Sequence, residues 1–216
     1  ESPKVYDKLL LPQDSPLRKA VVISNPLGED FSIMRTVSLH GMLTSLSTNF
    51  NRRNKNVRLY ELGNIYLPKQ VPVTELPEER MQFTLGMYGE GDFFTMKGVI
   101  EEFLYKAGMK LKPEYDPEAG KPFLHPGRQA NVVYDGTVIG YLGEVHPTVA
   151  ANYAIKERVY VAVLDMPEIV SRASFDHKYE GIAKFPAAAR DISMVVPKKV
   201  LAGDIEKIFD EKGGQF

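Results

Sequence analysis

The residues in this sequence most able to do chemistry are four histidines, and their spacing is poor for a metal site. They are His40, His125, His146 and His177. Glu144 and His146, two positions apart, come nearest to a pair of metal ligands. A closed zinc site needs four ligands, and the chain has no cysteine. An enzyme with a metal site around Glu144 and His146 is therefore a rival hypothesis, to be tested by metal analysis, whereas His40 is interpreted as a packed or partner-facing side chain.

Other short patterns also fail to indicate catalysis. Gly86, Gly89 and Gly91 match neither the dinucleotide-binding nor the Walker spacing, so we interpret them as a plain loop. The chain has no Gly-x-Ser-x-Gly motif, and the absence of cysteine excludes a cysteine nucleophile, a disulfide scaffold and an iron–sulfur cluster. Motif by motif, the sequence predicts no catalytic residue.

The densest basic cluster consists of Arg52, Arg53, Lys55 and Arg58. Cations are favoured near the C-terminal end of a helix, so the first interpretation is a solvated helix end. The alternative is contact with an acidic partner or an RNA backbone. A second rival hypothesis is thus a stand-alone nucleic-acid binder that uses this cluster and Lys198-Lys199, which predicts tight, salt-sensitive tRNA binding by the chain alone.

Composition narrows the class of protein. The 216 residues include 27 Lys and Arg against 28 Asp and Glu, a net charge of −1, which argues against a generic binder of phosphate backbones. Hydrophobic residues at 44% and charged residues at 25% are ordinary values for a globular chain that buries a core. No apolar run approaches the roughly 20 residues of a membrane span, so we expect no membrane partner.

Periodicity predicts the elements that would position these residues. The N-terminal half predicts an extended segment over 1–18, a buried strand over 19–23, a helix over 39–50, a strand over 57–67, a strand over 81–88 and a helix over 96–107 ended by Gly108. Apolar side chains on both faces of the strand 57–67 predict that it lies inside a sheet.

The C-terminal half begins with its clearest signal, Asp135-Gly136, the favoured pair of a two-residue hairpin turn. The predicted elements are strands over 130–134 and 137–142, a helix over 147–153, a strand over 158–164, a helical turn over 167–172, a linker over 174–186, a strand over 191–196 and a helix over 201–212. This order predicts an α+β fold with an antiparallel sheet, not alternating βαβ units.

Four stretches, in this order, resemble one family. They are residues 23–36 (ISNPLGEDFSIMRT), 56–66 (NVRLYELGNIY), 124–130 with 140–147 (LHPGRQA and GYLGEVHP), and 185–196 (FPAAARDISMVV). The chain resembles the β subunit of bacterial phenylalanyl-tRNA synthetase along essentially its whole length. His40 departs from the family's pattern, which has a proline before Gly41.

The resemblance implies a fold and a division of the chain. Residues 1–183 would form a class II aminoacyl-tRNA synthetase-like antiparallel sheet flanked by helices, and residues 184–216 the incomplete start of a C-terminal ferredoxin-like anticodon-binding domain. It also implies that the chain is a piece of a longer subunit, with the editing site and the magnesium-binding carboxylates upstream.

The resemblance further implies a function. The core-like region would be non-catalytic and would support assembly with the α subunit, in an (αβ)₂ tetramer, and positioning of tRNA(Phe) for aminoacylation with ATP and magnesium in the cytoplasm. Arg58 and Glu61 lie on the strand that resembles motif 2, but partner residues for ATP and a motif 3 arginine between 158 and 185 are absent. No catalytic, cofactor-binding or metal residue is therefore carried over, and the piece alone is expected to be inactive.

The residues expected to matter are structural. Asn25 and Pro26 would shape a turn, and Gly63 would permit a close approach to the backbone. Leu39, Leu43 and Leu46 would bury one helix face. His125-Pro126-Gly127 and His146-Pro147 would form ordered turns bordering the hairpin.

Overall fold

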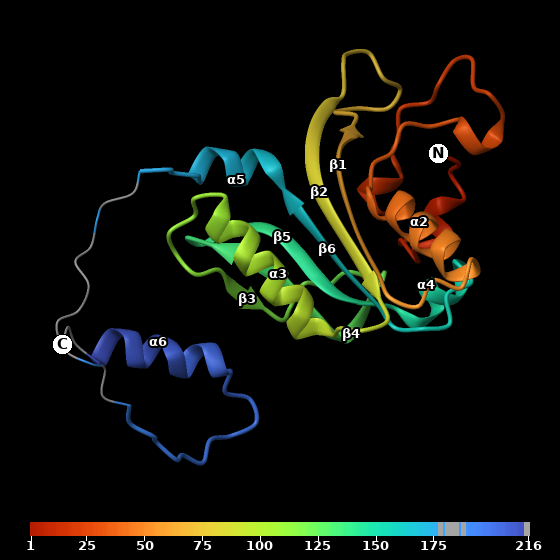
Figure 1. Cartoon of the computed structure of the whole chain (residues 1–216). Helices are drawn as coiled ribbons and strands as arrows, with labels where there is room; N and C mark the ends of the chain where they lie inside the picture. Colours follow the sequence, from red (N-terminus) through yellow and green to blue (C-terminus); the bar gives the residue numbers. More distant parts are fainter. Residues whose placement is uncertain (177–178, 180–185, 187–188, 214–216) are drawn as a thin grey trace. The chain divides into compact units, whose positions relative to one another are not determined.

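The computed structural model describes residues 1–176, 179, 186 and 189–213 (Figure 1). The chain divides into two compact units, Glu1–Ser174 and Phe175–Phe216. The domain boundary predicted at 183/184 lies outside the described residues, as does most of the linker predicted over 174–186.

The first unit contains five α-helices, two 3₁₀ turns and six strands. The helices are α1 (Val5–Lys8), α2 (Leu39–Asn51), α3 (Phe93–Lys106), α4 (Pro147–Asn152) and α5 (Met166–Arg172), with 3₁₀ turns at Pro16–Arg18 and Glu29–Phe31. The strands are β1 (Val57–Leu67), β2 (Glu78–Tyr88), β3 (Glu114–Asp116), β4 (Leu124–Tyr134), β5 (Thr137–Val145) and β6 (Val159–Asp165).

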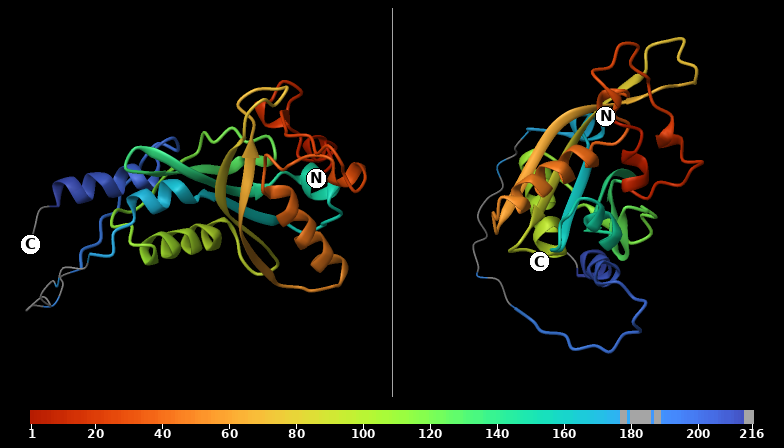
Figure 2. Two further views of the ribbon diagram at one scale, coloured as in Figure 1. Left: turned by 90° about the horizontal axis from the view of Figure 1, so that it is seen from above. Right: turned by 90° about the vertical axis from the view of Figure 1, so that its right-hand side faces the viewer.

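All six strands belong to one antiparallel sheet. Their order is β1-β2-β6-β5-β4-β3. Both views in Figure 2 show β1 and β2 as a long twisted pair whose connecting loop projects from one end of the sheet. The predicted α+β fold with an antiparallel sheet is confirmed.

Two hydrophobic cores lie on the two faces of this sheet, and β6 contributes to both. Its Val159 and Val161 join a cluster with α1, α2 and α4, whereas Tyr160, Ala162 and Leu164 join a cluster with α3 and α5. Successive side chains of a strand point to opposite faces, which explains the division. A strand that is buried on both faces has a continuous run of apolar residues in its sequence, as residues 159–164 do.

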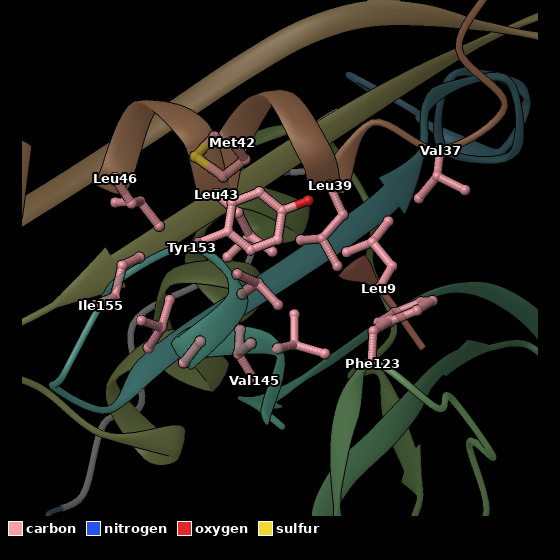
Figure 3. Close-up of a cluster of buried hydrophobic side chains, with 14 of the residues drawn as sticks. Leu9, Val37, Leu39, Met42, Leu43, Leu46, Phe123, Val145, Tyr153 and Ile155 are labelled. Carbon is pink, nitrogen blue, oxygen red and sulfur yellow. The ribbon is translucent and has the colours of Figure 1, made fainter. Parts of the chain in front are cut away.

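Helix α2 packs its predicted apolar stripe onto the sheet. Leu39, Leu43 and Leu46 are completely buried, as predicted, and Figure 3 shows them directed with Met42 toward Tyr153 and neighbouring core side chains. Gly86 on β2 permits this packing, because a Cβ there would lie 2.7 Å from the Met42 Cγ.

Local signals predicted the end of α3 and the hairpin turn correctly, but not the start of α3. Gly108 follows the C-cap of α3 with φ +83°, a conformation that favours glycine. Asp135 and Gly136 have φ +48° and +71°, which are the positive values that a type I′ hairpin turn requires. Asp92 begins α3, and its carboxylate accepts a hydrogen bond from the Thr95 N–H at 2.8 Å.

The prediction that the strand 57–67 lies inside the sheet is wrong. β1 pairs only with β2 and forms an edge of the sheet. Tyr60 and Leu62, which suggested a buried second face, are 72% and 54% exposed. Helix α3 covers the β2 side of that face, where Phe83 stacks on Phe103 at 4.5 Å between ring centroids, and leaves these two β1 side chains uncovered.

Two N-terminal predictions are also wrong. The segment 1–18 is folded into α1 and a 3₁₀ turn, because its apolar residues Val5, Tyr6, Leu9 and Leu11 are buried in the core beneath α2 and α4. The segment 19–23 forms a single bridge, Val22 to Ile33, instead of a buried strand, and Val22 is 71% exposed.

Three predicted strands have bounds that differ by more than one residue: β2, β4 and β5, the last of which runs to Val145 instead of ending at 142. β2 begins at Glu78, because backbone pairing with β1 continues past the apolar residues to Leu67. β4 begins at Leu124 and includes His125-Pro126-Gly127, with an irregular register between Leu124 and Gln129. β3 lies between the predicted helix 96–107 and the predicted strand 130–134, where no strand was predicted.

The described residues of the second unit contain one helix, α6 (Ala202–Lys212), as predicted. The strand predicted over 191–196 is wrong, since those residues have no regular structure. A strand needs a neighbour to accept its backbone hydrogen bonds, and the described residues 189–213 supply none.

Candidate functional site

The strand that resembles motif 2 carries a half-buried ion pair. The Arg35 Nη1 donates to Glu61 Oε1 at 2.6 Å, and the Arg35 Nε donates to the Asn64 carbonyl at 2.6 Å. Gly63 makes room for this guanidinium, because a Cβ there would lie 2.0 Å from the Arg35 Nη2. The close approach predicted at Gly63 is thus observed, and Glu61 is engaged in holding the segment before α2 against β1.

Arg58 and Glu61 are not brought together. They are three positions apart on β1, so their side chains point to opposite faces of the sheet. Arg58 is exposed and donates only a long hydrogen bond, 3.4 Å, to the Glu90 carbonyl. The two residues therefore do not form one polar site.

Glu144 and His146 serve structural roles. Glu144 is 4% exposed, and the Arg128 Nη1 donates to its two carboxylate oxygens at 3.0 and 3.1 Å. His146 begins α4, and its Nδ1 accepts from the Thr148 N–H at 3.2 Å. The part of the chain that the structure describes holds no group of three potential metal ligands. The geometry does not favour the metal-site hypothesis.

His40 is a packed side chain that joins two helices. Its Nδ1 lies 2.6 Å from the Tyr153 hydroxyl, and the Ser47 hydroxyl donates to the Tyr153 carbonyl at 2.6 Å. Burial lowers the pKa of His40 to about 4, so the ring is neutral at pH 7 and shares a hydrogen bond with the Tyr153 hydroxyl. Burial also raises the pKa of the Tyr153 hydroxyl.

The other residues singled out in the sequence also shape the backbone. The Gly127 N–H donates to the His125 Nδ1 at 3.1 Å, a local bond within β4. Gly89 and Gly91 lie in the loop between β2 and α3, as predicted, with φ +92° and +131°. Gly86, which was interpreted as part of the same loop, lies in β2 instead. Asn25 and Pro26 lie in exposed bends before the second 3₁₀ turn, and His177 lies outside the described residues.

A groove over the sheet face was not predicted. A cavity of about 490 Å³ has an apolar wall that includes Leu11, Leu17, Val37, Ile65 and Phe123. A smaller cavity of about 170 Å³ shares Gln82, Lys121 and Tyr141 with it. Burial lowers the pKa of Lys121. These residues come from segments far apart in the chain, so no local motif could have revealed the groove.

Two polar side chains at the groove are engaged in contacts within the fold. Its lining contains no histidine, and the Thr36 hydroxyl within it is hydrogen-bonded to Tyr6 and to the Leu17 carbonyl. Asp165, in the smaller cavity, pairs through one carboxylate oxygen with Arg80. These hydrogen bonds and this ion pair are consistent with a structural role for the polar side chains at the groove.

Comparison with known proteins identifies the family to which the chain belongs. The family described as phenylalanyl tRNA synthetase beta chain CLM domain matches residues 1–166. The chain belongs to this family. The resemblance inferred from the four sequence stretches is therefore confirmed, and it covers α1 through β6 with all six strands of the sheet.

Individual relatives match almost the whole chain. The phenylalanine–tRNA ligase beta subunit of Clostridium acetobutylicum is 44% identical over 99% of this chain, and that of Clostridium tetani is 42% identical over 100%. The Bacillus subtilis protein of the same name is 33% identical over 90% of the chain. The chain spans only about a quarter of the length of these relatives, 27%, 27% and 25% respectively.

Proposed function

We propose that this chain is a non-catalytic part of the β subunit of phenylalanine–tRNA ligase. In this role it supports assembly of the α and β subunits and positions tRNA(Phe) for ATP-dependent aminoacylation. The observation that carries the proposal is the match of β-subunit relatives along 99–100% of the chain.

The ion pairs of two carboxylates, Glu61 and Glu144, support a non-catalytic role. Glu61, on the strand that resembles motif 2, forms an ion pair with Arg35, and Glu144 forms an ion pair with Arg128. A catalytic acid or base needs an open position for substrate, and each of these carboxylates is instead held by an arginine. These two residues stabilise the fold around β1 and β5.

Two finer structural assignments belong to the proposal. An antiparallel sheet with helices packed on both faces is consistent with the class II synthetase-like arrangement proposed for residues 1–183. Residues 184–216, with α6, would be the first part of a ferredoxin-like anticodon-binding domain, whose remaining strands would come from the rest of the subunit.

Magnesium does not fit the described residues of this chain. They contain no group of three potential ligands, and the carboxylate on the motif 2-like strand is taken by Arg35. We therefore assign ATP and magnesium to other parts of the complete enzyme, in the cytoplasm, and derive no chemical step through this chain.

The proposed partners are the α subunit, a second αβ pair in an (αβ)₂ tetramer, and tRNA(Phe). The name "beta subunit" of the relatives supports a second type of chain. No helix within residues 1–176 or 189–213 has the length and apolar character to cross a membrane.

The experiment compares the 216-residue chain with the complete assembly. The chain alone should show no phenylalanine-dependent ATP–pyrophosphate exchange. The complete β subunit that contains it, co-expressed with its α subunit, should show exchange and aminoacylate tRNA(Phe). Exchange by the chain alone would contradict the proposal, as would a complete assembly that cannot charge tRNA(Phe).

A variant separates a structural carboxylate from a catalytic one. Glu61→Gln in the complete assembly should keep the kcat for aminoacylation within about twofold, because Glu61 contacts Arg35 and no reacting group. A loss on the order of 10² in kcat, with the protein still folded, would place Glu61 in the chemistry instead.

A further inference from the structure

A cluster of four cations occupies the turn between α2 and β1. Arg52, Arg53, Lys55 and Arg58 are all exposed. We call these four residues the basic turn. They lie within seven positions of one another, in a chain whose net charge is −1, so positive charge is concentrated here against a neutral background.

The arginines of the basic turn differ from the others in the first unit. Residues 1–174 contain nine arginines, and six of them have a carboxylate oxygen within 4.0 Å: Arg18, Arg35, Arg80, Arg128, Arg158 and Arg172. Within residues 1–174, the three without such a partner are Arg52, Arg53 and Arg58. The unpaired guanidinium groups are therefore gathered at one place.

The backbone at Arg53 gives a second indication. Arg53 follows the C-cap residue of α2 with φ +63°, a position where glycine is the usual residue because a side chain is strained there. An arginine kept in this conformation costs folding free energy. Strained backbone positions gather at functional sites, so the Arg53 side chain is a candidate for a binding role.

The turn is also held rigidly against the neighbouring strand. The Tyr88 hydroxyl donates to the Asn54 carbonyl at 2.8 Å, and the Asn56 side-chain oxygen accepts from the Glu90 N–H at 3.0 Å. These bonds fix the backbone from which the four cations project. A preorganised surface loses less entropy on binding than a flexible one.

We propose that the basic turn contacts the phosphate backbone of the tRNA bound by the assembled enzyme. This inference rests on the proposed function, which supplies an RNA substrate. Arginine is suited to the contact because its planar guanidinium donates two parallel hydrogen bonds to a phosphate. The contact reads no base, so it adds affinity and orientation without sequence specificity.

The main test is the salt dependence of tRNA binding. The complete β subunit carrying Arg52→Gln, Arg53→Gln, Lys55→Gln and Arg58→Gln is assembled with its α subunit. Each lost phosphate contact should flatten the plot of log affinity against log salt by about 0.7 to 0.9, so the four substitutions should reduce the slope by about 3. The KM for tRNA should rise roughly tenfold at moderate salt, while ATP–pyrophosphate exchange stays within twofold.

A matched control carries substitutions at two exposed lysines that have carboxylate partners. Lys69 pairs with Glu75 and Lys106 with Glu102. The variant Lys69→Gln with Lys106→Gln should leave the salt slope unchanged. An equal loss of slope in this control would show that net charge, not the basic turn, governs the binding.

Arg53→Gly separates RNA binding from folding. Glycine relieves the strained backbone, so the thermal midpoint should stay the same or rise. The salt slope should nevertheless fall by about 0.7 to 0.9. If the arginines serve only to stabilise the end of α2, the thermal midpoint should fall instead and the slope should not change.

Two outcomes overturn the inference. An unchanged salt slope and KM in the fourfold variant would exclude the RNA contact. Loss of the α subunit from the purified fourfold variant would assign the surface to an acidic protein partner. A wild-type assembly that cannot charge tRNA(Phe) is a different result, since it contradicts the proposed function itself.

Discussion

At the scale of single residues, Gly63 stabilises the fold because it has no side chain and leaves room for the Arg35 guanidinium. The Arg35 guanidinium passes over Gly63 to reach Glu61 and the Asn64 carbonyl. The site is only partly exposed, so these charge-assisted hydrogen bonds are stronger than those of a surface pair. The absence of a Cβ is what permits both bonds at once.

Gly63→Ala should therefore destabilise the chain. The new Cβ would displace Arg35 and break its hydrogen bonds, at a net cost of about 1–2 kcal/mol in the free energy of unfolding. Urea denaturation of the purified chain measures the change. Gly98→Ala is the control, because Gly98 lies in α3 with nothing near its Cβ, and this change should stabilise by about 0.5–1 kcal/mol. Equal effects of the two substitutions would refute the role of Arg35.

The His40–Tyr153 pair makes stability depend on pH. The pKa of His40 falls from the ordinary 6.5 to about 4 because its ring is partly buried, with Lys8 nearby. The folded chain thus binds fewer protons than the unfolded chain between these values. The contribution of His40 to stability should therefore be lost as the pH falls from 6.5 toward 4.

The variant His40→Gln should flatten this part of the stability profile. The Glu1 carboxyl, whose burial raises its pKa to about 7, titrates in the same range with the opposite sign, so the two proteins must be compared with each other. Chemical denaturation at pH 7, 6, 5 and 4 gives both profiles. Parallel profiles over this range would show that His40 is not the group responsible.

At the scale of elements, β1 illustrates what an edge position does to a strand. It is as long as β2 and rich in apolar residues, but no strand among the described residues pairs with its outer side. Tyr60 and Leu62 stay exposed on one face of it. β6, in contrast, has a strand on each side and helices packed on both faces.

Hydrogen exchange should distinguish these two strands. The amides of β6 should exchange only on global unfolding, since both of its edges are paired. Outward-facing amides of β1 should exchange faster, with Tyr66 as the exception because its N–H donates to the Arg35 carbonyl at 2.8 Å. Uniform protection along β1 in the isolated 216-residue chain would contradict the edge position.

Two glycines at the ends of elements provide a second test at this scale. Gly108 and Gly136 have similar positive φ values, +83° and +71°, but only Gly108 is crowded, with a Cβ position 2.6 Å from the Ser174 carbonyl oxygen. Gly136→Ala should cost about 1 kcal/mol for the strained backbone. Gly108→Ala should cost more than that, because the backbone at Ser174 must also move. Thermal unfolding of both variants measures the difference.

At the scale of the whole molecule, the first unit carries both cores. Every buried core residue of the described chain lies between Val5 and Ile169. The described residues of the second unit include no buried side chain, and Ile192, Val195 and Ile208 are exposed. Both cores are thus built from residues of the first unit.

A chain that ends at residue 174 should keep the stability of the first unit. Its free energy of unfolding and its m-value in urea should match those of the corresponding transition of the 216-residue chain within error. A drop of more than about 1 kcal/mol would show that the second unit contributes to the core.

The sequence alone predicted the structural features that depend on residues adjacent in the chain. The stripe of α2, the hairpin at Asp135-Gly136 and the end of α3 at Gly108 follow from the conformational preferences of single residues and from periodicity. The family also followed from the sequence, since four ordered stretches have a combined specificity that no single motif has.

Only the tertiary structure decided which surfaces are covered. The sequence of β1 contains the same apolar residues whether its second face is buried or open, so its edge position could not be predicted. The burial of residues 5–11 and the ion pair of Arg35 with Glu61 likewise depend on segments far apart in the chain. So does the absence, among the described residues, of a carboxylate within 4.0 Å of the basic turn. The physical reason is that periodicity reports the preference of a side chain for water, whereas burial and pairing are decided by whichever distant element packs against it.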